Sequence, residues 1–430
     1  MKYVSCVLLC LLCLVFFLEH ACAAGILSSY PIDFSLFVND RLYFLNNFFD
    51  SGNKSFDQNR DLHVVYVNPA LTVSLGPRMQ GIFEVEGQFI YDMDRHDFND
   101  DVDLRNAYLR AALPGLNWIN FSMGQQALST MGGLIYDDES PALRMKADLE
   151  RGFDLPLKFD ALITEVKYNS PYLNVDLRYC FSFLESVSFS YGWFRDTDDG
   201  VARIFNYLNE EKKYKSSGKI QWFGLSTKKF AGDVFLKSTF IYERGTTRLR
   251  QKQAGKDELQ MRGYLFDITG EYSLNKKLSL GLFFYLASGD KRPARGALTS
   301  FVAIDPYVDK TNIFFNGGMG RDFSSDNVGL AGIHPSGVIT PGVSLDYRVR
   351  ENIFFKAVFA YLFTQKSSRG AGHTYGWEAD FMGSYNLSKN FQLFSEVNFF
   401  NPGKYFKKLT GYRDNRASEI TIGVNYLFNN

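Results

Sequence analysis

Residues 420–428 read Ile-Thr-Ile-Gly-Val-Asn-Tyr-Leu-Phe, and this segment indicates the fold more directly than any other part of the chain. Apolar or aromatic side chains stand at every second position, which is the period of a β-strand with two different faces. One apolar face suits the wall of a membrane β-barrel, because only closure leaves no backbone edge unpaired in hydrocarbon. Taken alone, the segment fits the edge strand of a soluble sandwich equally well.

The N-terminus has the pattern of a secretory signal peptide. Lys2 precedes an apolar run over 4–18, and the Ala-Cys-Ala-Ala sequence at 21–24 supplies a small-residue cleavage site. The run is shorter than the roughly 20 residues that a spanning helix needs, which argues against an uncleaved anchor. We therefore expect residues 1–23 to be removed, with cleavage one residue later as the alternative. Residues 24–430 would then form a single barrel domain.

Composition narrows the class further. Four of the five cysteines lie in the leader, so Cys180 is left alone and an internal disulfide is excluded from the mature chain. Aromatic residues make up 16% of the chain, an excess that a barrel can place in its lipid face and interfacial girdles. The formal net charge is zero, which gives no indication of a nucleic-acid-binding surface.

The connections between strand-like segments alternate in length along the chain. About eighteen two-faced segments can be traced, from 33–45 to 418–428, and short turns such as Gly76-Pro77 and Asn275-Lys276-Lys277 separate every second pair. The longer connections are expected at 92–102, 127–141, 196–217, 244–261, 289–336 and 401–417. Bacterial outer-membrane barrels sort their connections in this way, with short periplasmic turns and longer extracellular loops.

We therefore predict an all-β protein: a transmembrane antiparallel β-barrel of about 18 strands in the bacterial outer membrane, with its N-terminus in the periplasm. Charges on the lipid face cost roughly 2 to 4 kcal/mol for Arg or Lys near the midplane, so the charged face of each strand should point inward. The pore-lining residues expected on this basis are Arg41, Glu84, Glu86, Arg110, Arg144, Lys146, Arg178, Lys237, Asp267, Glu271, Asp346, Arg348, Lys356, Glu378, Asp380 and Glu396.

Several short motifs resemble those of the alginate export porin family. They are Asn39-Asp-Arg41-Leu-Tyr43, Leu104-Arg-Asn-Ala-Tyr-Leu109, Gly124-Gln-Gln126 and Ser288-Gly-Asp290. The resemblance implies a monomeric barrel of about eighteen strands whose narrow, arginine-rich lumen passes a polyanionic sugar. Arg41 and Arg110 match the inward arginines of that family.

The mixed charge of the predicted lumen favours a different cargo. A polyuronate needs a continuous positive potential, because each unpaired acidic side chain in a narrow pore repels its carboxylates. Passive diffusion of small hydrophilic or charged solutes is therefore the first hypothesis. Dedicated export of an anionic polysaccharide such as alginate, or a loop-based receptor or adhesin on a plugged barrel, are the alternatives.

No enzymatic or metal chemistry is predicted. The histidines at 63, 96, 334 and 373 stand singly, without a recognisable nucleophile motif. The acidic segment 92–103 could attract calcium, but it lacks the glycine and terminal glutamate of an EF-hand loop. We expect no cofactor and no specific metal.

Two further expectations concern loops and partners. The segment 289–336 is long and glycine-containing, so it could fold into the pore as a constriction or a lid. The expected partners are outer-membrane lipid, small hydrophilic solutes or anionic sugars, and the barrel assembly machinery, which would recognise the C-terminal strand.

Overall fold

A computed structural model of the chain describes residues 31–50, 55–166, 170–197, 215–251, 254–291, 297–315, 336–367, 372–406 and 415–429. The predicted signal peptide, residues 1–23, lies outside the described residues. Among the described residues, no helix is long and apolar enough to cross a membrane.

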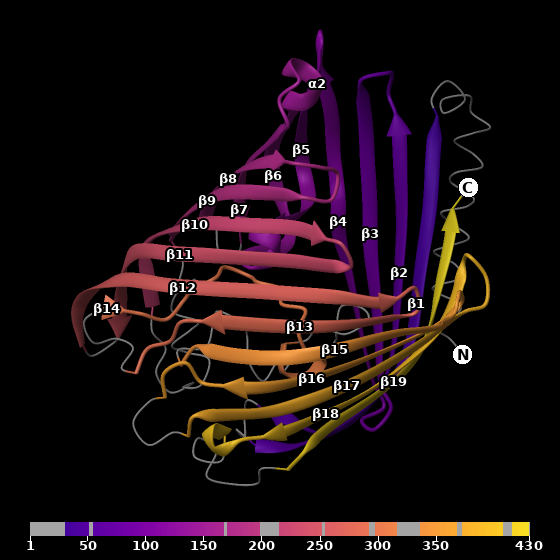
Figure 1. Ribbon diagram of the computed structural model, residues 1–430, viewed down its shortest axis with the longest axis vertical. Helices are drawn as coiled ribbons and strands as arrows, with labels where there is room; N and C mark the ends of the chain where they lie inside the picture. Colours follow the sequence, from indigo (N-terminus) through magenta and orange to yellow (C-terminus); the bar gives the residue numbers. More distant parts are fainter. Residues whose placement is uncertain are drawn as a thin grey trace.

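Eighteen antiparallel strands form the wall of a barrel (Figure 1). They are β1 (Ile32–Asp50), β2 (Ser55–Ser74), β3 (Met79–Asp92), β4 (Asp97–Leu113), β5 (Leu116–Thr130), β6 (Tyr136–Asp148), β7 (Leu157–Val166), β8 (Ser170–Cys180), β9 (Ser186–Asp196), β10 (Lys215–Ala231), β11 (Val234–Gln251), β12 (Ala254–Asn275), β13 (Leu278–Ala287), β15 (Val338–Arg350), β16 (Ile353–Phe363), β17 (Thr374–Asn386), β18 (Phe391–Pro402) and β19 (Ala417–Asn429). The shorter elements are η1 (Met131–Gly133), α2 (Leu149–Phe153), α4 (Asn312–Phe315) and the two-residue strand β14 (Ala297–Leu298), which pairs in parallel with β12.

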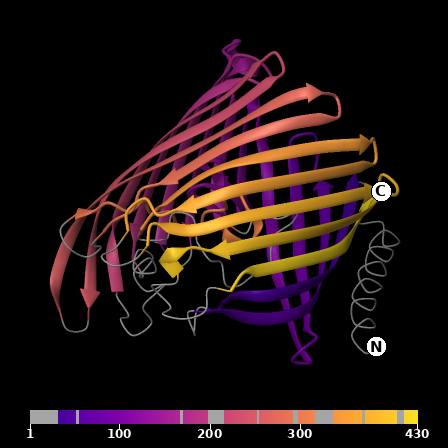
Figure 2. The same ribbon diagram turned by 60° about the horizontal axis from the view of Figure 1, so that its bottom comes forward.

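The C-terminal strand closes the barrel. β19 pairs with β18 on one side and with β1 on the other, and Figure 2 shows β1 and β19 side by side. In this last pairing Arg41 stands opposite Gly423 and Tyr43 opposite Thr421. Every described strand of the wall has a neighbour on both sides, which confirms the predicted antiparallel barrel of eighteen strands and excludes the soluble sandwich.

The two faces of the wall differ as the alternation predicts. On β19, Ile420 and Ile422 are 43% and 52% exposed on the outside, whereas Glu419 and Thr421 are almost fully buried on the inside. Tyr264 and Tyr272 mark the two borders of the apolar outer band on β12. They stand eight positions apart, about 27 Å along a strand, and a strand tilt of about 40° turns this into a band about 20 Å thick. The wall is therefore the right height for a thin bilayer.

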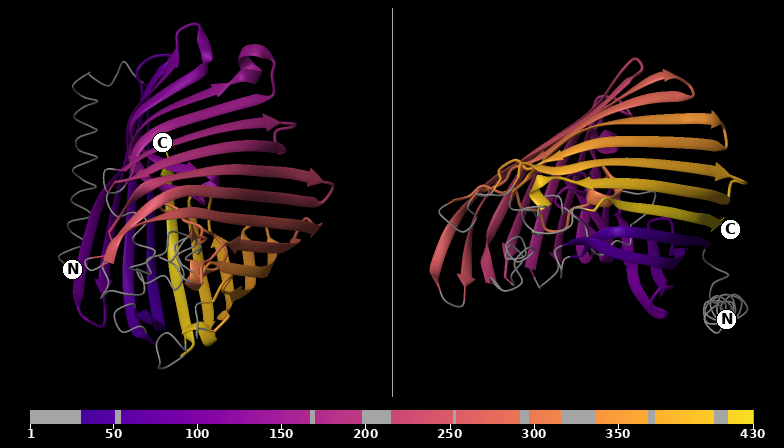
Figure 3. Two further views of the ribbon diagram at one scale, coloured as in Figure 1. Left: turned by 90° about the vertical axis from the view of Figure 1, so that its left-hand side faces the viewer. Right: turned by 90° about the horizontal axis from the view of Figure 1, so that it is seen from below.

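Several connections are shorter than expected, because the strands extend into them. β3 and β4 are joined by residues 93–96 alone, β5 and β6 by 131–135, and β11 and β12 by 252–253. Most residues of the long loops predicted at 92–102, 127–141 and 244–261 therefore lie in strands, and these three loop predictions are wrong. The short turns at the other end of the barrel, visible in Figure 3, agree with the prediction. We call that end, where β1 begins and β19 finishes, the turn end, and the opposite end the loop end.

Candidate functional site

The interior of the barrel is the candidate site, and its turn-end half is polar and open. Two neighbouring cavities of about 190 and 340 Å³ share Asp160, Asp176 and Arg178 in their walls. Eight cationic side chains line the two cavities, against the three carboxylates Asp148, Asp160 and Asp176: Arg110, Arg144, Lys146, Arg151, Lys158, Arg178, Lys228 and Lys237. We call this region the basic chamber.

Part of the positive charge in the basic chamber is paired. Arg144 Nε donates to Asp160 Oδ1 at 2.8 Å in a two-pronged contact. Arg178 donates from Nε to Ser188 Oγ at 3.1 Å and lies 3.8 Å from Asp176. Lys228 and Lys237 stand directly opposite each other on β10 and β11. With more cations than carboxylates, the chamber keeps a net positive charge.

Five of the predicted pore-lining residues line the basic chamber: Arg110, Arg144, Lys146, Arg178 and Lys237. The sequence prediction missed the other three cations of the chamber, Arg151, Lys158 and Lys228. Arg151 lies in a connection between two predicted strands. Lys158 and Lys228 stand at the ends of predicted strands, where alternation alone does not assign a face.

The mouth of the chamber lies at the turn end. A cavity of about 580 Å³ there is lined by Lys158, Arg178 and Lys228, by the rings of Phe230 and Phe235, which pack at a tilt, and by Cys180. Cys180 is the last residue of β8, a free thiol that is half-buried. A free thiol therefore lies at the turn-end opening of the chamber.

A further cavity, of about 270 Å³, is lined by three lysines and four carboxylates and lies against the long connection between β13 and β15. Five predicted residues line it: Lys237, Asp267, Glu271, Asp346 and Lys356. Lys310, from the connection, lies 2.7 Å from Asp267, and both side chains are only 10% exposed. Arg348 lies further toward the turn end, exposed on the same strand as Asp346.

The loop-end half of the interior is filled by the chain itself. Segment 297–315 crosses the barrel: Trp222 Nε1 donates to Val302 O at 2.9 Å, and the Val302 amide donates to Glu243 Oε2 at 2.6 Å. Further on, the Ile304 amide donates at 2.9 Å to the carbonyl of Ile135 in the β5–β6 turn. The described part of the connection 289–336 therefore lies inside the barrel, as the length of the segment suggested.

Three buried acidic side chains hold the end of this segment. Glu378 accepts hydrogen bonds from the Thr311 hydroxyl at 2.8 Å, from the Phe314 amide at 2.9 Å and from the Ile313 amide. Asp380 accepts from the Asn312 amide at 3.1 Å. Glu396 accepts from the Asn312 side chain at 3.1 Å. We call residues 297–315 the inserted segment.

These acids do not face water, although they were expected to line an aqueous pore. Each is almost completely buried beneath the inserted segment. Around them, Phe314 packs against the rings of Phe315, Tyr375 and Phe400. A continuous apolar cluster thus occupies the loop-end half, and the prediction of an entirely wet, polar lumen is wrong there.

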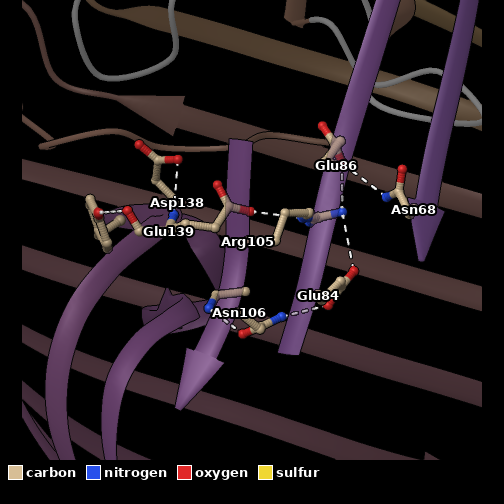
Figure 4. Close-up of polar contacts among 9 residues, drawn as sticks. Asn68, Glu84, Glu86, Arg105, Asn106, Asp138 and Glu139 are labelled. Atoms are coloured by element: carbon tan, nitrogen blue, oxygen red, sulfur yellow. Dashed lines mark hydrogen bonds and ion pairs between the residues drawn. The ribbon is translucent and has the colours of Figure 1, made fainter. Parts of the chain in front are cut away.

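A network around Arg105 lines the wall at β2 to β6 (Figure 4). Arg105 contacts Glu86 at 2.9 Å and Glu139 at 3.1 Å, and Glu84 lies 4.0 Å away. Asn106 donates to Glu84 at 2.6 Å. The four charged side chains are 16–25% exposed, so the space beside them is not filled.

Sequence alternation missed Arg105 because of a β-bulge. Glu84 pairs with Asn106, but the next residue, Val85, pairs with Leu104, which leaves Arg105 as the extra residue of β4. Such an insertion reverses the inward and outward positions beyond it. Arg105 therefore points inward, although it is five residues from the inward Arg110.

Arg41 is part of the packed wall. Its Nη1 donates to the Tyr43 hydroxyl at 2.8 Å, and its guanidinium lies 5.7 and 5.3 Å from the ring centres of Tyr66 and Phe394. The residue is only 5% exposed. Of the two arginines that the alginate-porin resemblance singled out, Arg110 lines the basic chamber, whereas Arg41 is packed in the wall.

The residues considered for catalysis or metal binding are scattered. His63 contacts Asp40 at 2.7 Å on the outer face, and His96 lies near the Tyr91 hydroxyl at the β3–β4 turn. His334 lies outside the described residues. In the part of the chain that the structure describes, no three His, Cys, Asp or Glu side chains are grouped so that they could hold a metal ion.

No family model and no curated protein matches the sequence of this chain. Solved structures of Pseudomonas aeruginosa proteins are similar in fold. OccK5 (OpdH) has a TM-score of 0.56 and 12% identity over 93% of this chain and 98% of its own. The outer membrane protein OprD has a TM-score of 0.54 and 11% identity over 93% and 94%. OpdK with vanillate has a TM-score of 0.52 and 12% identity over 92% and 98%. At these identities the likeness establishes the barrel fold that the chain shares with them.

Proposed function

We propose that this chain is a porin of a bacterial outer membrane, through which small hydrophilic solutes diffuse passively and anions pass more readily than cations. The observation that carries this proposal is the basic chamber, where eight cations and three carboxylates line open cavities of about 190 and 340 Å³. The apolar outer band and the closed wall supply the membrane part of the proposal.

Electrostatics in a confined space explain the preference for anions. A cleft with walls of low dielectric constant concentrates counter-ions, and exposed charges act over a Debye length of about 8 Å at physiological ionic strength. The two cavities of the basic chamber share Asp160, Asp176 and Arg178 in their walls, so the cations that line them act together on a solute. Segment 297–315 fills much of the loop-end half, which limits the solutes to small ones.

The similar solved structures support the proposal without deciding it. OprD is described as an outer membrane protein, and OpdK was solved with vanillate, a small aromatic carboxylate. A small organic anion is also the kind of solute that the charge of the basic chamber would admit.

The test is the conductance of the purified mature protein in a planar lipid bilayer between unequal concentrations of KCl. We expect discrete open channels and a reversal potential of the sign that marks chloride as the more permeant ion. A closed barrel with no conductance, or a channel that prefers potassium, would contradict the proposal.

Export of an anionic polysaccharide, the cargo implied by the resemblance to alginate export porins, is the second candidate. The basic chamber favours it, but the packing of Arg41 and the filled loop-end half do not. Block of the channel by short uronate oligomers at low concentration would favour export over general diffusion. A barrel without conductance would favour the third candidate, a receptor or adhesin that acts through its loops.

The expected partners follow from the same proposal. Lipid would surround the outer band between the two tyrosine borders, and the assembly machinery would recognise β19, whose outward side chains alternate with buried ones over most of its length. No catalytic role is proposed.

A further inference from the structure

The outer wall carries a row of aromatic side chains near the middle of four neighbouring strands. Tyr191 on β9 stands opposite Phe223 on β10, Phe223 opposite Tyr242 on β11, and Tyr242 opposite Tyr264 on β12. Aromatic side chains with polar tips collect at the border between hydrocarbon and headgroups. This row therefore marks the membrane–water border on this side of the barrel.

Four cations lie immediately beyond the aromatic row, toward the loop end. In the next outward row Arg244 stands opposite Arg262, and in the row after that Arg195 stands opposite Lys219. All four side chains are exposed. We call Arg195, Lys219, Arg244 and Arg262 the outer basic patch.

The outer basic patch places like charges directly across the strands. Such cross-strand pairs of equal charge are destabilising unless something neutralises them. Across the described strands β9 to β12, neither row contains a carboxylate. The neighbouring Glu258 forms an ion pair with Arg248, at 3.1 Å. Among the described residues, the side chains of Arg195 and Lys219 have no hydrogen-bond or ion-pair partner, although their backbones pair in the sheet. No side chain among the described residues supplies the neutralising negative charge.

Part of the patch is held in place by its neighbours. The Arg244 guanidinium lies 5.1 Å from the centre of the Phe223 ring, and its Nε donates to Gln221 Oε1 at 2.9 Å. Gln221 in turn donates to the Tyr191 hydroxyl at 2.9 Å. Arg262 donates to Gln260 at 3.1 Å. These contacts fix two guanidinium groups at headgroup height with donors left for a ligand.

We propose that the outer basic patch binds the phosphate groups of an anionic lipid in the leaflet at the loop end of the barrel. Guanidinium and ammonium groups make charge-assisted hydrogen bonds to phosphate oxygens, and Arg does so with two parallel bonds. The acyl chains of the same lipid would lie below the aromatic row, on the apolar band. A single lipid would contact both the outer basic patch and the apolar band, whereas a free phosphate ion would contact only the patch. The proposal rests on the membrane location given under the proposed function, but not on conductance.

The experiment is native mass spectrometry of the purified mature protein with diphosphoryl lipid A or with phosphatidylcholine. We expect the wild-type chain to retain lipid A in preference to phosphatidylcholine. The variant with Arg195→Gln, Lys219→Gln, Arg244→Gln and Arg262→Gln should lose lipid A binding by on the order of tenfold or more, because each cation near an anionic leaflet contributes to the attraction. Inorganic phosphate in millimolar excess should not displace the lipid.

A matched control removes four exposed cations at the opposite end, by Lys276→Gln, Lys277→Gln, Arg350→Gln and Lys389→Gln. It has the same net charge as the patch variant and should bind lipid A like the wild type. If the patch variant does not refold, the double variant Arg195→Gln, Lys219→Gln spares the contacts of Arg244 and should still weaken binding several-fold. Equal lipid A binding by wild type and patch variant, equal retention of the two lipids, or displacement by inorganic phosphate would overturn the proposal.

Discussion

The two halves of the barrel interior are enclosed by the same strands but differ in what occupies them. Toward the loop end, the inserted segment and the β5–β6 turn pack apolar side chains such as Ile135, Phe301 and Phe314 into a dry cluster. Toward the turn end, the basic chamber holds cations around open space. An inward-facing position is therefore not in itself a pore-lining one, because the loops decide which inward residues meet water.

Reversing the charge of the basic chamber should have the largest effect. In a variant with Arg178→Glu, Lys228→Glu and Lys237→Glu, we expect the chloride-to-potassium permeability ratio to fall by on the order of tenfold, since local potentials of several kT set the ion concentrations in such a cleft. Reversal potentials in a KCl gradient measure it. A control with Lys276→Glu, Lys277→Glu and Arg350→Glu, at the exposed turn tips, should change the ratio little. Equal permeability ratios in the two variants would show that the cations of the basic chamber do not set the ion selectivity.

Removing the filling of the loop-end half should have the next largest effect. Replacement of residues 291–335 by a short Gly-Ser linker takes out the inserted segment, and the single-channel conductance should rise several-fold because the constriction widens. The same exchange at the turn 387–390, at the opposite end, is the control. An unchanged conductance in the first variant would show that the inserted segment does not limit flow.

Loosening the inserted segment should have a smaller, local effect. Glu378→Ala leaves the donors of Thr311, Ile313 and Phe314 without their acceptor, which costs about 1–3 kcal/mol when such groups stay buried. We expect faster proteolysis within 297–315 and a noisier open channel. Glu271→Ala removes an exposed carboxylate from the same interior and serves as the control. Identical digestion of the two variants would contradict the anchoring role of Glu378.

A single exposed cation of the basic chamber should matter least. Lys158 is exposed near the mouth of the chamber, where salt screens its charge over a Debye length of about 8 Å. We expect Lys158→Gln to change the permeability ratio by less than about twofold at physiological salt and by more at low salt. A change that does not depend on salt would point to a direct binding contact.

Alternation and the connection pattern predicted the wall well, because lipid outside a closed sheet imposes one rule on every strand. The strand count, the closing role of residues 420–428 and the outward aromatic side chains follow from that rule. Lys158 and Lys228 were missed, since a residue at a predicted strand end has no assigned face. Arg105 was missed because a β-bulge reverses the alternation, and the bulge has no clear sign in the sequence.

The filling of the barrel was only partly predictable from the sequence. The length of segment 289–336 indicated that it could fold inward, but its contacts with Trp222, Glu243 and Glu378 join residues 59 to 80 positions apart. No local pattern encodes such pairings. For this reason Glu378, Asp380 and Glu396 were expected to face water, whereas in the structure they hold backbone amides and polar side chains.

Cys180 offers the most direct test of an open, positively charged turn-end half, since it is the only cysteine beyond the predicted leader and lines the mouth beside Lys158, Arg178 and Lys228. The measurement is its rate of modification, in the folded mature protein, by a sulfonate-bearing methanethiosulfonate and by its trimethylammonium analogue. We predict that both reagents react and that the anionic one reacts faster. A thiol that neither reagent reaches, or one that the cationic reagent modifies faster, would contradict a basic, water-filled chamber.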